Sequence, residues 1–109
     1  MLNKTYCSAV YGINACTITV EVIVSTGLHY YIVGLPDNAV KESLRRVESA
    51  ITSCQLHMPR QKIVVNLAPA DMRKEGSSYD LSIAIGILAS SGQMTNELLA
   101  DYLILGELS

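Results

Sequence analysis

Apolar and polar residues alternate along the first third of the chain, as they do in strands with one buried face. The clearest run covers residues 17–24, where every second residue from Ile18 to Val24 is apolar. Weaker runs cover 4–10 and 28–34, and turn-forming segments lie at 11–14 and 25–27. The pattern predicts three strands, and the short second connection predicts that the second and third strands pair as an antiparallel hairpin.

A helical period follows the third predicted strand. Asp37 has the side chain of a helix N-cap, and Glu42 and Arg46 have the i,i+4 spacing of an ion pair. The apolar residues that recur at helical spacing are Val40, Leu44, Val47, Ile51 and Cys54. This single apolar stripe predicts one helix that packs on the sheet.

The second half of the chain adds a strand, a loop, a helix and a last strand. Residues 62–67 are predicted as a short buried strand, and 71–78 as a polar loop. A second helix is predicted to run to about Ser91, capped by Asp80 or a neighbouring serine and apolar around most of its circumference. The apolar residues 102–108 are predicted as a final strand. The order βββαβαβ predicts an α/β (α+β) sandwich with one mixed sheet and two main helices.

Composition narrows the class of protein. The chain has 109 residues, of which 50% are hydrophobic, so we expect a single domain over 1–109. A buried strand at the very end predicts a fragment of a longer protein. The net charge is −2, whereas a dedicated nucleic-acid surface usually brings a basic excess. Three cysteines without metal-site spacing, no signal peptide and no long apolar run predict a cytoplasmic protein with no membrane contact.

Neither a nucleotide site nor a metal site is predicted within the chain. A phosphate-binding P-loop needs the string GxxxxGK[ST], which the seven glycines never produce. His29 and His57 lie far apart in sequence, with no other ligand type at metal-site spacing. We therefore expect no cofactor in this chain.

Several short strings resemble one family in order and spacing. They are Gly-Leu-Pro-Asp at 34–37, Ala-Pro-Ala-Asp-Met-Arg-Lys-Glu-Gly at 68–76, Asp80-Leu81, and Leu-Gly-Glu-Leu at 105–108. From about Tyr6 to Ser109 the chain resembles the N-terminal, ChlI-like domain of the magnesium-chelatase-like AAA+ proteins of the ComM/YifB family. It departs from that family at Ser77 and Ser82, where the family often has proline.

The resemblance implies both a fold and a context. The fold would be that of ribosomal protein S5 domain 2, which the Lon protease domain shares. The full-length protein would carry a AAA+ ATPase module, and ATP and magnesium are expected only there. The implied partners are that ATPase module and neighbouring subunits of a homo-oligomer. Family members are associated with DNA branch migration during natural transformation, so DNA is a further possible partner.

The charged loop after the 62–67 strand has two interpretations. Asp71, Arg73, Lys74 and Glu75, together with Asp80, form either a solvated loop with internal ion pairs or an interface. As an interface it could dock the ATPase module or DNA. The carboxylates of Asp71 and Glu75 would repel phosphate, so we favour docking to protein.

Ser78 is the one candidate nucleophile. Lys-Glu-Gly-Ser-Ser at 74–78 looks similar to the loop that carries the nucleophilic serine of Lon. Such a serine needs a base within hydrogen-bond reach, and Lys74 and Lys41 are the only local substitutes for the lysine of Lon. The alternative is that Ser77 and Ser78 cap the second helix or satisfy loop amides. We predict a non-catalytic accessory domain; a Lon-like serine peptidase and a stand-alone nucleic-acid-binding domain are the alternatives.

Overall fold

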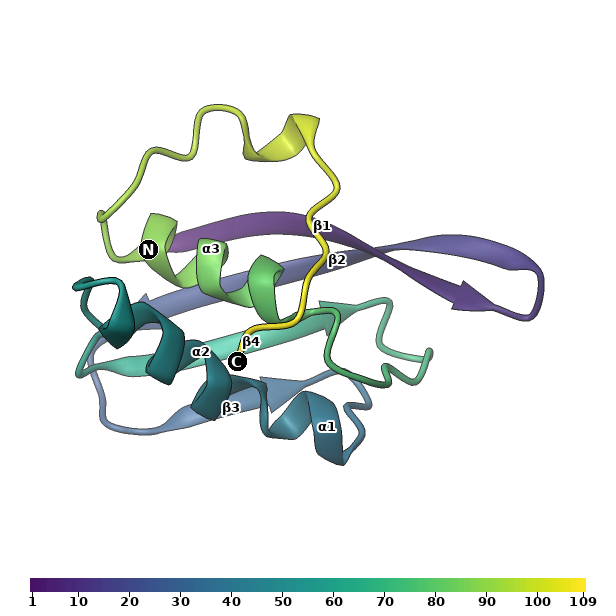
Figure 1. Ribbon diagram of the computed structural model, residues 1–109, viewed down its shortest axis with the longest axis horizontal. Coiled ribbons are helices and arrows are strands. Elements are labelled where there is room, and N and C mark those ends of the chain that lie inside the picture. Colours follow the sequence, from purple (N-terminus) through teal and green to yellow (C-terminus); the bar gives the residue numbers. More distant parts are fainter.

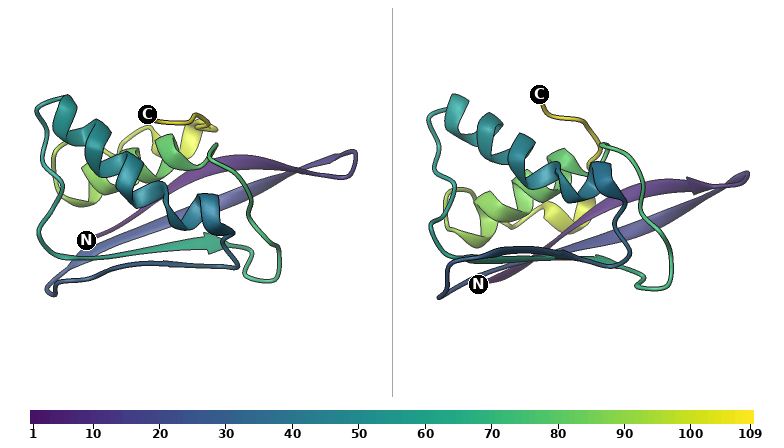
Figure 2. Two further views of the ribbon diagram at one scale, coloured as in Figure 1. Left: turned by 60° about the horizontal axis from the view of Figure 1, so that its bottom comes forward. Right: turned by 90° about the horizontal axis from the view of Figure 1, so that it is seen from below.

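Two helices cover one face of a four-stranded sheet in the computed structural model, which describes residues 1–109 (Figure 1, Figure 2). The sheet has the strand order β1-β2-β4-β3. The α/β class with one mixed sheet and two main helices is therefore confirmed. The elements are β1 (Leu2–Tyr11), β2 (Asn14–Ser25), β3 (Tyr30–Val33), α1 (Asn38–Lys41), α2 (Ser43–Ser53), β4 (Lys62–Ala68), α3 (Asp80–Ser90) and a 3₁₀ helix, η1 (Leu99–Asp101).

The predicted antiparallel hairpin between the second and third strands is wrong. β2 pairs antiparallel with β4, placing Val22 opposite Val65, and β3 pairs parallel with β4, placing Ile32 opposite Val65. A helical crossover joins the parallel pair β3 and β4, as parallel strands require. β4 takes the central place because its alternate residues bury completely against the helices. Which strand occupies the centre of the sheet depends on pairing between residues more than 30 positions apart in the chain. A pattern of neighbouring residues does not contain that information.

The core lies between the sheet and the helices. α2 and α3 lie over one face of the sheet (Figure 2). The buried alternate residues of β2 and β4 form one hydrophobic cluster with buried residues of these helices. The apolar stripe from Val40 to Ile51 is buried as predicted, whereas Cys54 follows the end of α2 and is exposed. The prediction of one helix is wrong, because the stripe is divided at Glu42 between α1 and α2. The sheet residues that form this core include Cys7, Ile18, Val20, Val22, Val24, Ile63, Val65 and Leu67.

Helix α3 is buried on more than one side, as its apolar circumference predicts. Gly86 lies against β2, where a Cβ atom would come within 2.6 Å of Val22 Cγ2. The expected side-chain cap is absent: Tyr79 occupies the N-cap position and no side chain bonds the first-turn amides. Asp80 is the first helical residue, and its carboxylate has other partners. None of the helices is long and apolar enough to cross a membrane.

The last predicted strand, 102–108, is not a strand in the structure. Its backbone bonds go to two different elements: Ile104 N donates to Tyr6 O (2.7 Å), and Gly106 bonds Ser78 and Leu81 near the start of α3 (3.0 Å each). Because the partners change from β1 to α3, no ladder forms. Figure 1 shows this segment running from η1 across the end of α3.

Candidate functional site

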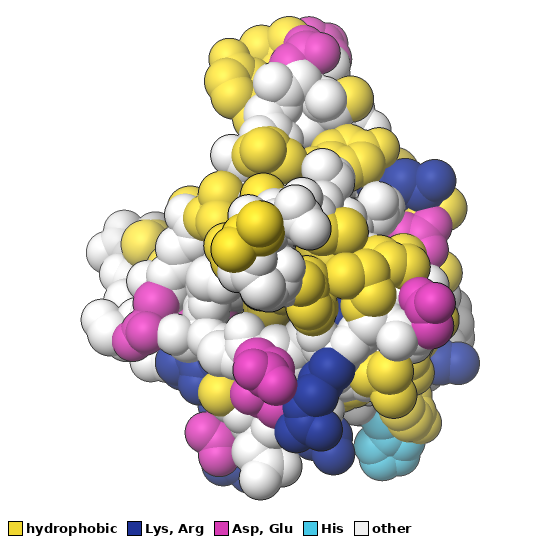
Figure 3. All heavy atoms as spheres, turned by 90° about the vertical axis from the view of Figure 1, so that its right-hand side faces the viewer, with side chains coloured by type: hydrophobic (Ala, Val, Ile, Leu, Met, Phe, Trp, Pro, Cys, Tyr) yellow, Lys and Arg dark blue, Asp and Glu magenta, His cyan; other side chains and the backbone are white.

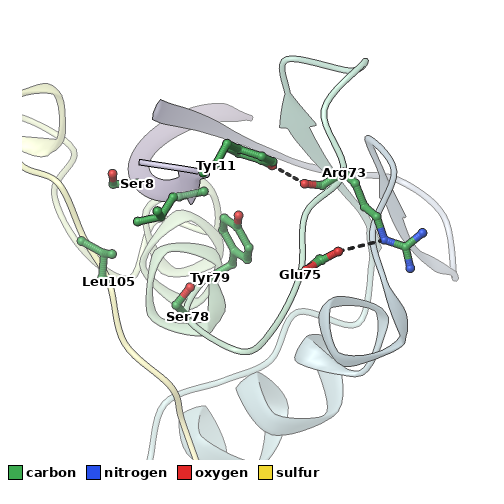
Figure 4. Close-up of a pocket in the computed structure, with 10 residues that line it drawn as sticks. Ser8, Tyr11, Arg73, Glu75, Ser78, Tyr79 and Leu105 are labelled. Carbon is green, nitrogen blue, oxygen red and sulfur yellow. Dashed lines mark hydrogen bonds and ion pairs between the residues drawn. The ribbon is translucent and has the colours of Figure 1, made fainter. Parts of the chain in front are cut away.

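An open cleft of ≈ 510 Å³ lies between the far end of β1 and the segment that leads into α3 (Figure 4). It gathers three of the residues singled out in the sequence, namely Arg73, Glu75 and Ser78. The others, Asp71, Lys74 and Asp80, do not line it. The complete lining is Ser8, Ala9, Val10, Tyr11, Gly12, Arg73, Glu75, Ser78, Tyr79 and Leu105.

Lys74 anchors the charged loop from inside. Its side chain is fully buried, and its ammonium donates to the carbonyl of Pro69. Its backbone forms an isolated parallel bridge with Pro36: Lys74 N donates to Leu35 O (3.0 Å), and Lys74 O accepts from Asp37 N (2.9 Å). Burial lowers the pKa of Lys74, although Asp71 partly opposes that shift. Lys74, which was predicted to lie at a docking surface, is thus a buried residue that stabilises the loop conformation.

Asp37 and Tyr11 fix the same loop from its other sides. One carboxylate oxygen of Asp37 caps α1 by accepting from Val40 N (2.8 Å), which confirms the predicted cap. The other oxygen accepts from Gly76 N (3.1 Å). Tyr11 donates its hydroxyl to the carbonyl of Arg73 (Figure 4). The strings at 34–37 and 68–76 are therefore two halves of one interlocked structure.

The charges on either side of Lys74 point outward. Arg73 Nε lies 3.3 Å from Glu75 Oε1, and the two side chains are 68% and 70% exposed. Asp71 is exposed as well. Figure 3 shows this end of the molecule, where acidic and basic side chains are interspersed and do not form one basic patch. The exposed surface of the loop therefore carries both signs of charge.

Asp80 is an internal residue, joining α2, α3 and the C-terminal segment. It is fully buried, and its carboxylate accepts two bonds from Arg46, at 2.6 and 3.0 Å. It also accepts from Leu108 N (3.2 Å). The predicted pair of Glu42 with Arg46 is present at 4.0 Å, but Asp80 is the closer partner and raises the pKa of the guanidinium. In this structure neither Asp80 nor Lys74 exposes a side chain to a partner, so the exposed part of the predicted interface is Asp71, Arg73 and Glu75.

Ser78 is exposed at the cleft, and its hydroxyl makes no hydrogen bond with another side chain. Its hydroxyl makes no hydrogen bond with Lys74, whose ammonium bonds Pro69, or with Lys41 on α1. The idea that the serines cap α3 is wrong as well, because Ser77 Oγ bonds Glu107 and no side chain caps the helix. The side chains do not gather three potential metal ligands anywhere in the structure.

Two tyrosines of the cleft, Tyr11 and Tyr79, were not predicted as site residues from the sequence. Tyr79 is 1% exposed, and its ring stands between Ser78 and the end of β1 (Figure 4). Burial raises the pKa of the Tyr79 phenol strongly, so it stays neutral at physiological pH. Tyr11 lies 62 residues before its partner Arg73. The only sequence signal for Tyr79 was its place between the charged loop and Asp80.

Comparison with known proteins identifies the family. Residues 20–109 match the family described as subunit ChlI of Mg-chelatase. The chain is 49% identical over 109 residues to the uncharacterized protein YifB of Escherichia coli (strain K12), and 45% identical over 105 residues to the competence protein ComM of Haemophilus influenzae. The uncharacterized protein Mb2921c of Mycobacterium bovis is 36% identical over 109 residues.

These alignments cover 99%, 95% and 99% of this chain, but only 22%, 21% and 22% of the relatives. The chain thus spans about a fifth of the length of the curated relatives it matches. The family match covers most of the chain, including the charged loop and the cleft residues from Arg73 onward. The chain therefore belongs to the ChlI family of magnesium-chelatase-related proteins, together with YifB and ComM.

Proposed function

We propose that this chain is a non-catalytic docking module of a magnesium-chelatase-like AAA+ ATPase of the ComM/YifB type. In this proposal its charged loop, residues 71–76, contacts the ATPase module or a neighbouring subunit of the parent protein. The family match supports the ATPase context, and the name of one relative, a competence protein, supports a role in DNA uptake or recombination.

The observation that carries the proposal is the way Lys74 holds the loop. One buried side chain pins the loop from inside while its two neighbours, Arg73 and Glu75, extend into solvent. The Tyr11 hydroxyl donates to the Arg73 carbonyl and the Asp37 carboxylate accepts from Gly76 N, which fixes the backbone on either side. A surface that is ordered before it binds loses little conformational entropy on binding, which favours association.

The mixed charge of the loop favours a protein partner over DNA. A DNA-binding surface neutralises phosphates with several lysines and arginines, and its affinity comes largely from that term. Here Arg73 is paired with Glu75, and Asp71 adds a second exposed carboxylate. Protein interfaces commonly arrange opposite charges to fix orientation and partner choice. Arg73, paired with Glu75, is therefore better suited to contact a protein than to contact a phosphate.

A Lon-like serine peptidase is the competing function, since Ser78 is exposed in the cleft. The ammonium of Lys74, the lysine four residues before it, bonds the Pro69 carbonyl and makes no hydrogen bond with the Ser78 hydroxyl. We therefore expect no labelling of Ser78 by a fluorophosphonate probe in the parent protein. Labelling that disappears in Ser78→Ala would instead establish the peptidase.

Cross-linking mass spectrometry on the parent protein tests the docking proposal. We expect cross-links between the cleft region and the rest of the polypeptide. Arg73→Glu should reduce their yield several-fold because it breaks the charge match and the pair with Glu75. Lys41→Glu is the matched control, since it makes the same charge reversal at an exposed position outside the cleft.

Two outcomes would contradict the proposal. One is equal yields in wild type, Arg73→Glu and Lys41→Glu, because the loop would then have no part in docking. The other is binding of the chain to a fluorescent DNA oligonucleotide that weakens steeply with salt and is lost in Arg73→Glu. That result would show that the loop is part of a nucleic-acid-binding surface.

A further inference from the structure

The free edge of β1 forms one wall of the cleft. β1 is an outer strand of the sheet, and its residues 8–11 line the cleft beside Leu105. Backbone groups of successive residues in a strand point to opposite sides, so alternate residues face the edge. Met1 N donates to Val24 O, and Val24 N donates to Met1 O, so this pair is hydrogen-bonded across β1 and β2. Because such pairs alternate along an antiparallel ladder, the backbone N–H and C=O groups of the odd-numbered residues of β1 point toward β2.

The even-numbered residues of β1 consequently present their backbone to the edge. The chain itself shows this at Tyr6, whose carbonyl accepts from Ile104 N at 2.7 Å. Ile104 belongs to the extended segment that follows η1. That segment then turns away to bond Ser78 and Leu81, and it leaves the edge beyond Tyr6 uncovered. The next outward residues, Ser8 and Val10, have no backbone partner for their amides.

We infer that the cleft binds an extended polypeptide segment that adds to the edge of β1 at Ser8 and Val10. This inference rests on the proposed docking function and names the form of the partner: a β-strand from the part of the parent protein outside this chain. The relatives are several times longer than the chain, so they contain additional polypeptide from which such a strand could come.

The opposite wall of the cleft suits such a strand. The exposed Ser78 hydroxyl and the Arg73–Glu75 ion pair can hydrogen-bond polar side chains on one part of the strand. The exposed side chain of Leu105 offers apolar contact farther along (Figure 4). In this mode of recognition, backbone hydrogen bonds supply affinity and alternate side chains supply specificity.

A peptide scan tests the inference. The probes are overlapping fifteen-residue peptides that tile the part of E. coli YifB outside the region this chain matches, with binding measured by fluorescence anisotropy. A bound peptide is then remade with one N-methylated amide at a time. Because alternate amides of a strand face its partner, N-methylation should weaken binding about tenfold at every second position and hardly at all between.

A pair of variants tests the protein side. Val10→Pro removes the outward amide and should weaken binding about tenfold, whereas Val10→Thr keeps that amide and a β-branched side chain and should bind normally. Thermal unfolding checks that both variants fold. If Val10→Pro does not, the N-methyl series decides alone, since it leaves the protein unchanged.

The outcomes separate this inference from the docking function. An alternating N-methyl pattern with loss in Val10→Pro supports strand addition. A peptide that needs Arg73 but shows no alternation and tolerates Val10→Pro overturns strand addition and leaves docking intact. The absence of any binding peptide also overturns strand addition, while the cross-linking experiment still decides docking.

Discussion

At the scale of single residues, the most informative position is Lys74. Lysine is almost never fully buried unless its charge has partners, and here one carbonyl, that of Pro69, accepts from the ammonium. The arrangement stabilises one particular loop conformation and disfavours conformations that would leave the ammonium unpaired in the interior. Lys74 therefore determines where Arg73 and Glu75 point, although it cannot itself contact a partner.

Truncating Lys74 should destabilise the fold more than truncating its exposed neighbour. Lys74→Ala removes a buried stem and the ammonium bond to the Pro69 carbonyl, which keeps only the long bond from Met72 N (3.4 Å). We therefore expect a loss of about 2–4 kcal/mol in the free energy of unfolding. Arg73→Ala should cost about 0.5 kcal/mol or less. Urea denaturation measures both, and equal losses would contradict the role assigned to Lys74.

The pH dependence of stability gives an independent test of the same burial. Burial lowers the pKa of Lys74 in the folded state, so between that value and the unfolded value of about 10.4 the unfolded chain binds more protons. The free energy of unfolding should therefore rise with pH across this window. Lys74→Met removes the titrating ammonium group but keeps most of the apolar volume of the lysine side chain.

The quantity to measure is the difference in unfolding free energy between wild type and Lys74→Met from pH 7 to 10. We expect this difference to move in favour of the wild type as pH rises. The raised pKa values of Tyr11 and Tyr79 contribute stability that is lost above about pH 10, but they do so in both proteins and cancel in the difference. A flat or falling difference would count against a buried ammonium.

Asp80 should behave as a structural residue and not as an interface residue. Removing its charge leaves the partly buried Arg46 guanidinium without its closest partner, so Asp80→Asn should cost about 2–4 kcal/mol. A double-mutant cycle with Arg46→Gln should give a coupling energy of about 1–3 kcal/mol. The control Glu42→Gln, at the exposed 4.0 Å partner, should cost less than about 0.5 kcal/mol. Additive losses in the cycle would refute the pair.

At the scale of elements, the contact of α3 with β2 depends on a missing side chain. Alanine is the better helix former by about 1 kcal/mol, yet a Cβ at position 86 would press on Val22. Gly86→Ala should therefore destabilise the wild type by about 1–2 kcal/mol. In a Val22→Ala background the same substitution should become stabilising. Thermal or urea unfolding of the four proteins checks this, and a stabilising Gly86→Ala in the wild type would show that the sheet yields easily.

The sequence identifies elements better than their pairing. A period of two correctly indicates β2 and a helical period correctly indicates α2, because burial of one face leaves that period in the residues themselves. β4 is indicated by a short apolar run, and α3 by apolar residues around most of its circumference. The partner of β3 is decided by which strand best fills the centre of the sheet, and no local period records it. Segment 102–108 is apolar like a strand, but its hydrogen-bond partners lie on two different elements.

At the scale of the whole molecule, the candidate site is only partly readable from the sequence. The charged string at 71–76 marks the place, since it has four charged residues within positions 71–75. The division into a buried lysine and two exposed charges depends on residues 34–37, which lie more than 30 positions earlier. The cleft also needs the end of β1, more than 60 positions earlier. Proximity of this kind exists only after folding.

Folding therefore converts the charged string at 71–76 into a preformed surface. Hydrogen exchange of residues 71–79, compared between the isolated chain and the parent protein, tests it directly. We predict slow exchange of the Lys74 and Gly76 amides in the isolated chain, because both have backbone or carboxylate partners there. We also predict added protection of the same segment in the parent. Exchange at unfolded rates in the isolated chain, or no added protection in the parent, would contradict a preformed docking surface.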